Sequence, residues 1–344
     1  MSDPTLTYPE AIVIGLLQGV TELFPVSSLG HSVLLPALIG GRWARDLSLT
    51  ADKSPYLAFV VAVHVATAVA LIWHFRADWV RIVRGLVSSV RTRSIATADQ
   101  RLAWLLVAAT IPVGLAGLAL EHAIRTALGR PVPAAIFLII NGVMLAAVER
   151  VRARRAVRPS GAGAAAVPLG SAHQYAPSAH RDGFGSSAHQ YAPSAHRDGV
   201  GSSAHLYASS AADPDQRLAR QSWAQALLIG AAQILALFPG ISRSGATIGA
   251  GLVRGLNHED AARFAFLLAT PVILAAGVLK MPELAAPSAR GVLGPVLAGS
   301  LVAGVAAYVS VRFLTRYFET RTLNPFAVYC VVAGLFSLAW LSLA

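Results

Sequence analysis

The chain has 344 residues, of which 55% are hydrophobic and only 13% are charged, and its mean hydropathy is +0.58. Soluble domains carry about 25% charged residues, so this composition excludes a cytosolic enzyme, a disordered protein and a secreted disulfide scaffold. The net charge of +11 comes almost entirely from arginine, which gathers in the cytoplasmic loops of membrane proteins. We therefore predict an all-α polytopic membrane protein that binds no nucleic acid.

Six apolar runs are long enough, or nearly long enough, to cross a bilayer. About 20 residues are needed to span roughly 30 Å of hydrocarbon. Pro271 lies inside one run and predicts a kink rather than an end, because neighbouring helices can satisfy the freed backbone groups. The predicted transmembrane helices are residues 55–75, 102–120, 132–148, 264–279, 291–311 and 323–344.

Two further apolar stretches, residues 9–41 and 222–253, are each interrupted by a break. The first break is FPVSS at 24–28, and the second is FPG at 238–240. An unbroken helix of this length would measure about 48 Å and each half only about 24 Å, so neither fits the hydrocarbon core. We predict two re-entrant segments built from half-helices, because irregular backbone at membrane depth must be surrounded by protein or line a cavity.

The two broken stretches also match each other at a constant offset of 215 residues. Gln18 matches Gln233, Ser27 matches Ser242, and Gly30 matches Gly245. Interrupted segments at corresponding places in two halves indicate a binding site at the repeat interface. We predict a first repeat at residues 1–155 and a second at 217–344.

The arginines predict the orientation of these repeats. They cluster in loops expected at 76–101, 150–158 and 312–321, and six spans place all three loops on one side, which the positive-inside rule makes cytoplasmic. Segment 9–41 then enters from outside and segment 222–253 from the cytoplasm. Opposite entry is what an inverted repeat requires.

Residues 156–216 separate the two halves and have a different composition. The sequence SAHQYAPSAHRDG at 171–183 recurs unchanged at 187–199. A His-rich tract can bind metal, but a tract this rich in Ser, Ala, Gly and Pro cannot bury a core. We predict a disordered cytoplasmic insert that takes no part in the site.

The break in the second stretch carries the residues expected to bind an anion. Gly240 sets a turn and Ser242 is a good N-cap for the half-helix that follows, whose unpaired N–H groups and positive dipole end suit a phosphate. Arg243 adds a planar fork of donors that matches phosphate oxygens. Hydroxyl donors come from Ser242, Ser244 and Thr247. Such an arginine amid apolar half-helices is costly without a partner or a function.

The break in the first stretch carries groups suited to catalysis. Gln18 and Glu22 are four residues apart and share one helix face, while Ser27 and Ser28 start the next half-helix and His31 lies about one turn further on. A carboxylate, a hydroxyl and an imidazole together can perform nucleophilic or general acid–base chemistry. Glu22 can also bind a hard cation that bridges phosphates, or simply pair with Arg243.

The sequences QGVTELFPVSSLGH at 18–31 and PGISRSGAT at 239–247 resemble the two signature motifs of the undecaprenyl-diphosphate phosphatases, the BacA/UppP bacitracin-resistance family. The resemblance covers nearly the whole chain outside the insert. It implies an inner-membrane enzyme, a homodimer among its possible assemblies, whose site opens to the outer face. The implied reaction is hydrolysis of undecaprenyl diphosphate to the monophosphate and inorganic phosphate with Mg²⁺ or Ca²⁺.

On this interpretation, the phosphates are held by Arg243, Ser242 and Thr247. Glu22 with Gln18 positions a metal or acts as a base. Either Ser28 or His31 attacks or relays the proton.

The alternative function belongs to another class of protein, because inverted repeats with broken helices are also a transporter architecture. A polyprenyl-phosphate transporter needs only the phosphate site and two access routes. A nucleophile and a base beside that site favour hydrolysis.

Overall fold

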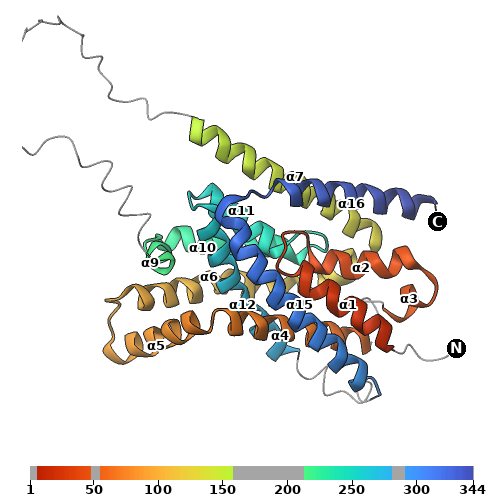
Figure 1. Cartoon of the computed structure of the whole chain (residues 1–344), viewed down its shortest axis with the longest axis horizontal. Coiled ribbons are helices and arrows are strands. Elements are labelled where there is room, and N and C mark those ends of the chain that lie inside the picture. The colour runs from red at the N-terminus through yellow and green to blue at the C-terminus, as the bar shows by residue number, and fades with distance from the viewer. Residues whose placement is uncertain (1–5, 48–54, 158–212, 281–290, 344) are drawn as a thin grey trace, which may run out of the picture. The chain divides into compact units, whose positions relative to one another are not determined.

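The computed structural model describes residues 6–47, 55–157, 213–280 and 291–343. All regular secondary structure in these ranges is helical (Figure 1). Residues 1–155 and 213–344 form one compact unit, separate from residues 156–212. The predicted insert therefore lies almost wholly outside the described residues.

Five helices among the described residues are long and apolar enough to cross a membrane, and the count rises to six when a bent helix pair is taken as one span. This confirms the all-α polytopic class. The five are α6 (Ala98–Leu128), α7 (Pro131–Val157), α12 (His258–Leu279), α15 (Leu293–Thr320) and α16 (Asn324–Leu343). Most exceed the apolar runs that predict them, because the helices continue into their polar and arginine-rich ends.

The bent pair that counts as the sixth span begins with α4 (Pro55–His74). This helix meets α5 (Arg76–Thr92) at an angle of 88°. The prediction of an arginine-rich loop after residue 75 is therefore wrong over most of its length. One face of α5 is buried and consists of Ile82, Gly85 and Ser89, which are spaced by about one helical turn. The helix α5 packs on α6. A helix with one buried stripe and arginines around it lies naturally along the end of a bundle.

Both broken segments form the predicted half-helices. The first consists of α1 (Tyr8–Thr21) and α2 (Ser28–Ile39), and a short α3 (Gly41–Asp46) follows it. The second consists of α10 (Trp223–Ala232), a 3₁₀ turn η1 (Gln233–Leu237) and α11 (Arg243–Val253). Ser27 caps α2 by accepting a hydrogen bond from the Gly30 amide, and its counterpart Ser242 caps α11 in the same way.

The duplication extends to the packing of the helices. The half-helix α1 packs on α15, and its counterpart α10 packs on α6. A Cβ added at Gly15 would lie 2.2 Å from the Gly299 carbonyl oxygen, and one added at the equivalent Gly230 would lie 2.0 Å from that of Ala109. Glycine is needed at both crossings because the backbones touch. The half-helices α1 and α10 therefore each pack against a long helix of the other half, as two interlocked repeats require.

The described chain resumes at Asp213 with α9 (Pro214–Ala219), inside the range predicted for the insert. Asp215 is buried and pairs with Arg81 of α5 and, at 2.8 Å, with Arg263 of α12. The predicted insert boundary at 216 is therefore too late. A buried carboxylate held by two arginines ties α9 to the helical unit.

Candidate functional site

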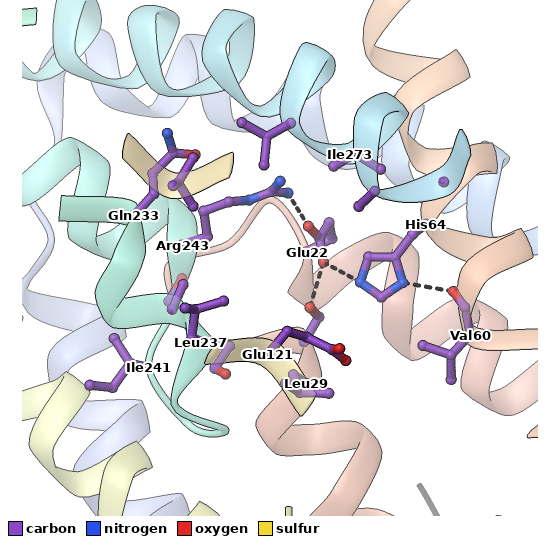
Figure 2. A pocket seen from close by; sticks show the side chains of 18 of the residues that line it. Glu22, Leu29, Val60, His64, Glu121, Gln233, Leu237, Ile241, Arg243 and Ile273 are labelled. Carbon is purple, nitrogen blue, oxygen red and sulfur yellow. Dashed lines mark hydrogen bonds and ion pairs between the residues drawn. The ribbon is translucent and has the colours of Figure 1, made fainter. Parts of the chain in front are cut away.

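The two breaks meet at a cavity of about 310 Å³, which Figure 2 shows from close by. Glu22, Ser27 and Ser28 reach it from the first break, and Ser242 and Arg243 from the second. Most of the other lining residues are apolar, and α4 and α12 contribute several of them. A mainly apolar pocket with a few convergent polar groups is the usual form of a small-molecule site.

Glu22 is the centre of this cluster. It lies at the C-terminal end of α1 and is buried. One carboxylate oxygen, Oε1, pairs with the Arg243 guanidinium, while Oε2 accepts hydrogen bonds from the Ser28 hydroxyl and, at 2.9 Å, from the Gln18 amide. The predicted convergence of Glu22, Ser28 and Arg243 is therefore present. The geometry joins the two motifs across more than 200 residues of sequence.

Backbone geometry in the first break places Ser28 over Glu22. Ser27 has a φ of +71°, a conformation that costs a residue with a side chain about 1–2 kcal/mol. Its hydroxyl offsets part of this cost by capping α2. The chain reverses within residues 22–27, so the first hydroxyl of α2 returns to the carboxylate at the end of α1.

Asn141 of α7 fixes the two breaks relative to each other, although sequence reasoning missed it. Its side-chain N–H donates to the Pro25 carbonyl at 3.0 Å, and its oxygen accepts from the Ser242 amide at 3.1 Å. Asn141 is completely buried. The signal in the sequence is a polar amide side chain within the otherwise apolar predicted span 132–148.

The predicted phosphate-binding residues divide into two groups. Arg243 and Ser242 line the cavity, but Gly240, Ser244 and Thr247 do not. The Ser244 hydroxyl donates to the Phe24 carbonyl at 3.1 Å, and the Thr247 hydroxyl donates to the Arg243 carbonyl at 2.7 Å. These hydroxyls therefore hold the break and the helix together.

Gly240 acts on the backbone alone. Its φ is +114°, and a Cβ at this position would lie 2.4 Å from the Ala134 carbonyl oxygen of α7. Both the left-handed conformation and the close approach exclude a side chain. Gly240 thus supports the turn that presents Arg243 and is not among the residues that line the cavity.

His31 is not brought to the cavity. Its Nδ1 lies 2.7 Å from the Ser27 carbonyl oxygen, and its Nε2 lies 2.8 Å from the Tyr329 hydroxyl of α16. A carbonyl only accepts, so Nδ1 carries the proton and Nε2 accepts from the tyrosine in the neutral ring. Both nitrogens of the neutral ring are engaged away from Glu22. The structure places His31 as a support for the strained Ser27 backbone.

The imidazole that does reach Glu22 is His64 of α4, which the candidate set from the sequence omits. Its Nε2 lies 3.4 Å from Glu22 Oε2, and its Nδ1 lies 2.7 Å from the Val60 carbonyl oxygen (Figure 2). Both neighbours are acceptors, so His64 donates to both only as an imidazolium. Its signal in the sequence is an ionisable residue within an otherwise uncharged apolar span.

Gln233, the counterpart of Gln18 in the second repeat, also lines the cavity. Its side chain is 1% exposed, and its Oε1 has no hydrogen-bond partner among the described residues. Leaving a buried acceptor unsatisfied costs about 1–3 kcal/mol. Further along the wall, Glu121 and Lys280 form an ion pair of 3.7 Å. The cavity thus contains one unsatisfied oxygen as well as charged groups of both signs.

Within the described residues, no group of three or more His, Cys, Asp or Glu side chains could hold a metal ion. Glu22 is the carboxylate at the centre of the cluster, and Gln233 adds an amide oxygen to the same wall. Mg²⁺ is often bound through one or two carboxylates together with the phosphates of a substrate. This donor set fits a hard cation that arrives together with a phosphate ligand.

Comparison with known proteins identifies the family of the chain. The chain matches the family model described as "Bacitracin resistance protein BacA" over residues 11–176 and 200–336, and the unmatched interval lies within the tandem repeat. It is 58% identical over 338 residues to the undecaprenyl-diphosphatase of Mycolicibacterium paratuberculosis, covering 98% of each chain. It is 55% identical to undecaprenyl-diphosphatase 1 of Frankia casuarinae, covering 96% of this chain and 97% of that one. The chain therefore belongs to the BacA bacitracin-resistance protein family.

Proposed function

We propose that this protein hydrolyses undecaprenyl diphosphate to undecaprenyl phosphate and inorganic phosphate, which recycles the lipid carrier of cell-wall synthesis and confers bacitracin resistance. The observation that carries the proposal is the joining of Ser28, Glu22 and Arg243 at one cavity. A hydroxyl, a base and a phosphate-binding cation at one point are what hydrolysis of a phosphate anhydride needs. The apolar walls suit the first part of a polyprenyl chain.

Arg243 binds the diphosphate in this proposal. It begins α11, whose positive dipole end also favours an anion. Arg243 pairs with Glu22 in the structure, which offsets the cost of burying its charge. The diphosphate takes over this pairing on binding, because phosphate oxygens match the guanidinium fork in the same way as a carboxylate.

Ser28 is the proposed nucleophile. Its hydroxyl already donates to Glu22, so the carboxylate accepts the proton as Ser28 Oγ attacks the terminal phosphorus. The bond between that phosphorus and the bridging oxygen breaks, and undecaprenyl phosphate leaves as an anion beside Arg243. Water then attacks the phosphoserine, the bond between phosphorus and Ser28 Oγ breaks, and Glu22 returns its proton to Oγ. The oxygen and both protons of the water leave with the inorganic phosphate. Gln18 and His64 hold Glu22 in place throughout.

We further propose that Mg²⁺ or Ca²⁺ joins the site with the substrate. Glu22 and the unsatisfied Oε1 of Gln233 are the oxygen ligands on offer, and both cations prefer such ligands. When bound, the cation neutralises phosphate charge that Arg243 alone would leave uncompensated.

The proposed location is the inner membrane, with the cavity open to the outer face. The arginine clusters at residues 76–101, 150–158 and 312–321 support this orientation through the positive-inside rule. We also propose that the protein assembles as a homodimer.

The deciding experiment is phosphate release from a C15 or C55 diphosphate by the purified protein, with and without EDTA. Ser28→Ala should abolish release, whereas Ser32→Ala should preserve it, because Ser32 is a buried serine of the same helix that does not line the cavity. With radiolabelled terminal phosphate, an acid-stable label on the protein should depend on Ser28. A protein that moves polyprenyl phosphate between leaflets but releases no phosphate would instead be the transporter.

A further inference from the structure

A second group of cationic side chains lies away from the site, around the C-terminal end of α15. A groove of about 470 Å³ is lined there by Arg312, Phe313, Arg316, Tyr317 and Arg321, which we call the arginine groove. None of these residues lines the cavity around Glu22. The arginine groove is therefore a distinct feature, unused by the proposed reaction.

Within the described part of the chain, no carboxylate pairs with the arginines of the arginine groove. All three arginines are exposed, and the structure gives their guanidinium groups no hydrogen bond or ion pair with any described residue. Arg312 and Arg316 are four residues apart and therefore lie on one face of α15. Three guanidinium groups around one hollow form a site for an anion with several oxygens, such as a phosphate ester.

The groove changes character along the helix axis. Val309 and Phe313, one to two turns before Arg316, are 61% and 50% exposed. In a transmembrane helix such side chains face the acyl chains of lipids. An apolar end that leads into a cationic end matches a phospholipid, whose acyl chain and phosphate follow in the same order. Basic pockets at the cytoplasmic ends of transmembrane helices recognise anionic headgroups in this manner.

One wall of the arginine groove also contacts the first break. The Phe313 ring stacks on that of Phe24, with centroids 5.9 Å apart and planes inclined by 7°. The Phe24 carbonyl accepts hydrogen bonds from Ser242 and Ser244 of the second break. A ligand that orders Phe313 would therefore steady the segment joining the two halves of the active site.

We propose that the arginine groove binds the phosphate headgroup of an anionic phospholipid, and that the bound lipid stabilises the catalytic breaks through the contact between Phe313 and Phe24. The binding part of this inference does not depend on the proposed reaction. Free phosphate shares the headgroup's chemistry, so the test separates the two ligands.

Lipid retention measured by native mass spectrometry tests the binding. The wild-type protein should retain phosphatidylglycerol about tenfold more strongly than phosphatidylcholine, and Arg312→Gln/Arg316→Gln should lose this preference, since two charge-assisted contacts are removed. The matched control is Arg84→Gln/Arg91→Gln, which removes the same charge from exposed positions of α5. Arg321→Gln should give an intermediate loss.

Three results would overturn the proposal. These are full retention of phosphatidylglycerol by the Arg312→Gln/Arg316→Gln variant, an equal loss in the α5 control, and displacement of the lipid by millimolar inorganic phosphate.

A second assay examines the coupling between the bound lipid and the catalytic breaks. Phosphatidylglycerol should stimulate the wild-type turnover several-fold over its turnover in neutral detergent. The same ratio measured for Phe313→Ala, against its own turnover in neutral detergent, should be close to one. Stimulation that survives in Phe313→Ala would refute the coupling.

Discussion

Replacing Glu22 by Gln tests the site most directly, because four side chains contact this carboxylate. The substitution keeps the shape but removes the charge that accepts the Ser28 proton. Loss of a general base lowers the rate by about 10²–10⁴. It also leaves the Arg243 guanidinium, whose side chain is 15% exposed, without its partner. Removing one member of a buried pair costs about 3–5 kcal/mol of stability.

These two effects can be separated with a second variant. Glu22→Gln/Arg243→Gln no longer carries the unpaired guanidinium, so it should recover much of the stability lost in Glu22→Gln, yet remain inactive. Glu10→Gln is the matched control: Glu10 is a buried carboxylate of the same helix that caps α1 outside the cavity. We expect its kcat/KM to stay within about threefold of wild type, since a capping contact is worth about 1 kcal/mol of stability. Phosphate release and thermal unfolding in detergent provide both readouts. Wild-type turnover by folded Glu22→Gln, or a double variant no more stable than the single one, would refute the reasoning.

Further predictions concern the other parts of the molecule. Arg243→Lys should lower kcat/KM by about a hundredfold although the charge is kept, because an ammonium cannot bind phosphate oxygens bidentately; near-normal kinetics would remove Arg243 from the site. His64→Leu should lower kcat by about tenfold or more, whereas His64→Gln should retain most of it by still donating to Glu22; equal losses in both variants would argue against positioning through a hydrogen bond. Deletion of residues 160–212, which carry the tandem repeat, should leave turnover within about twofold of wild type, since shortening a long connection changes loop entropy little; an inactive but folded deletion variant would show that the insert has a role.

The sequence alone was enough to predict the class of the protein and the position of both breaks, because these depend on local properties. Composition and the length of apolar runs indicate membrane helices whatever the tertiary structure. The half-helices begin at Ser28 and Arg243 as predicted, since Ser27 and Ser242 are caps that act on backbone within three residues. The match between the stretches also indicated that Glu22 and Arg243 would meet.

Only the tertiary structure decided which polar side chains face the cavity. The helix α4 is apolar on every side, so its sequence has no pattern that shows which face carries His64 inward. Its packing against α15 and α12 sets that rotation. Likewise, His31 is turned away from Glu22 by Tyr329, a residue of the last helix. The structure also assigns Ser244 and Thr247 to holding backbone. Contacts between residues far apart in the chain determine these orientations, and local periodicity contains no information about them.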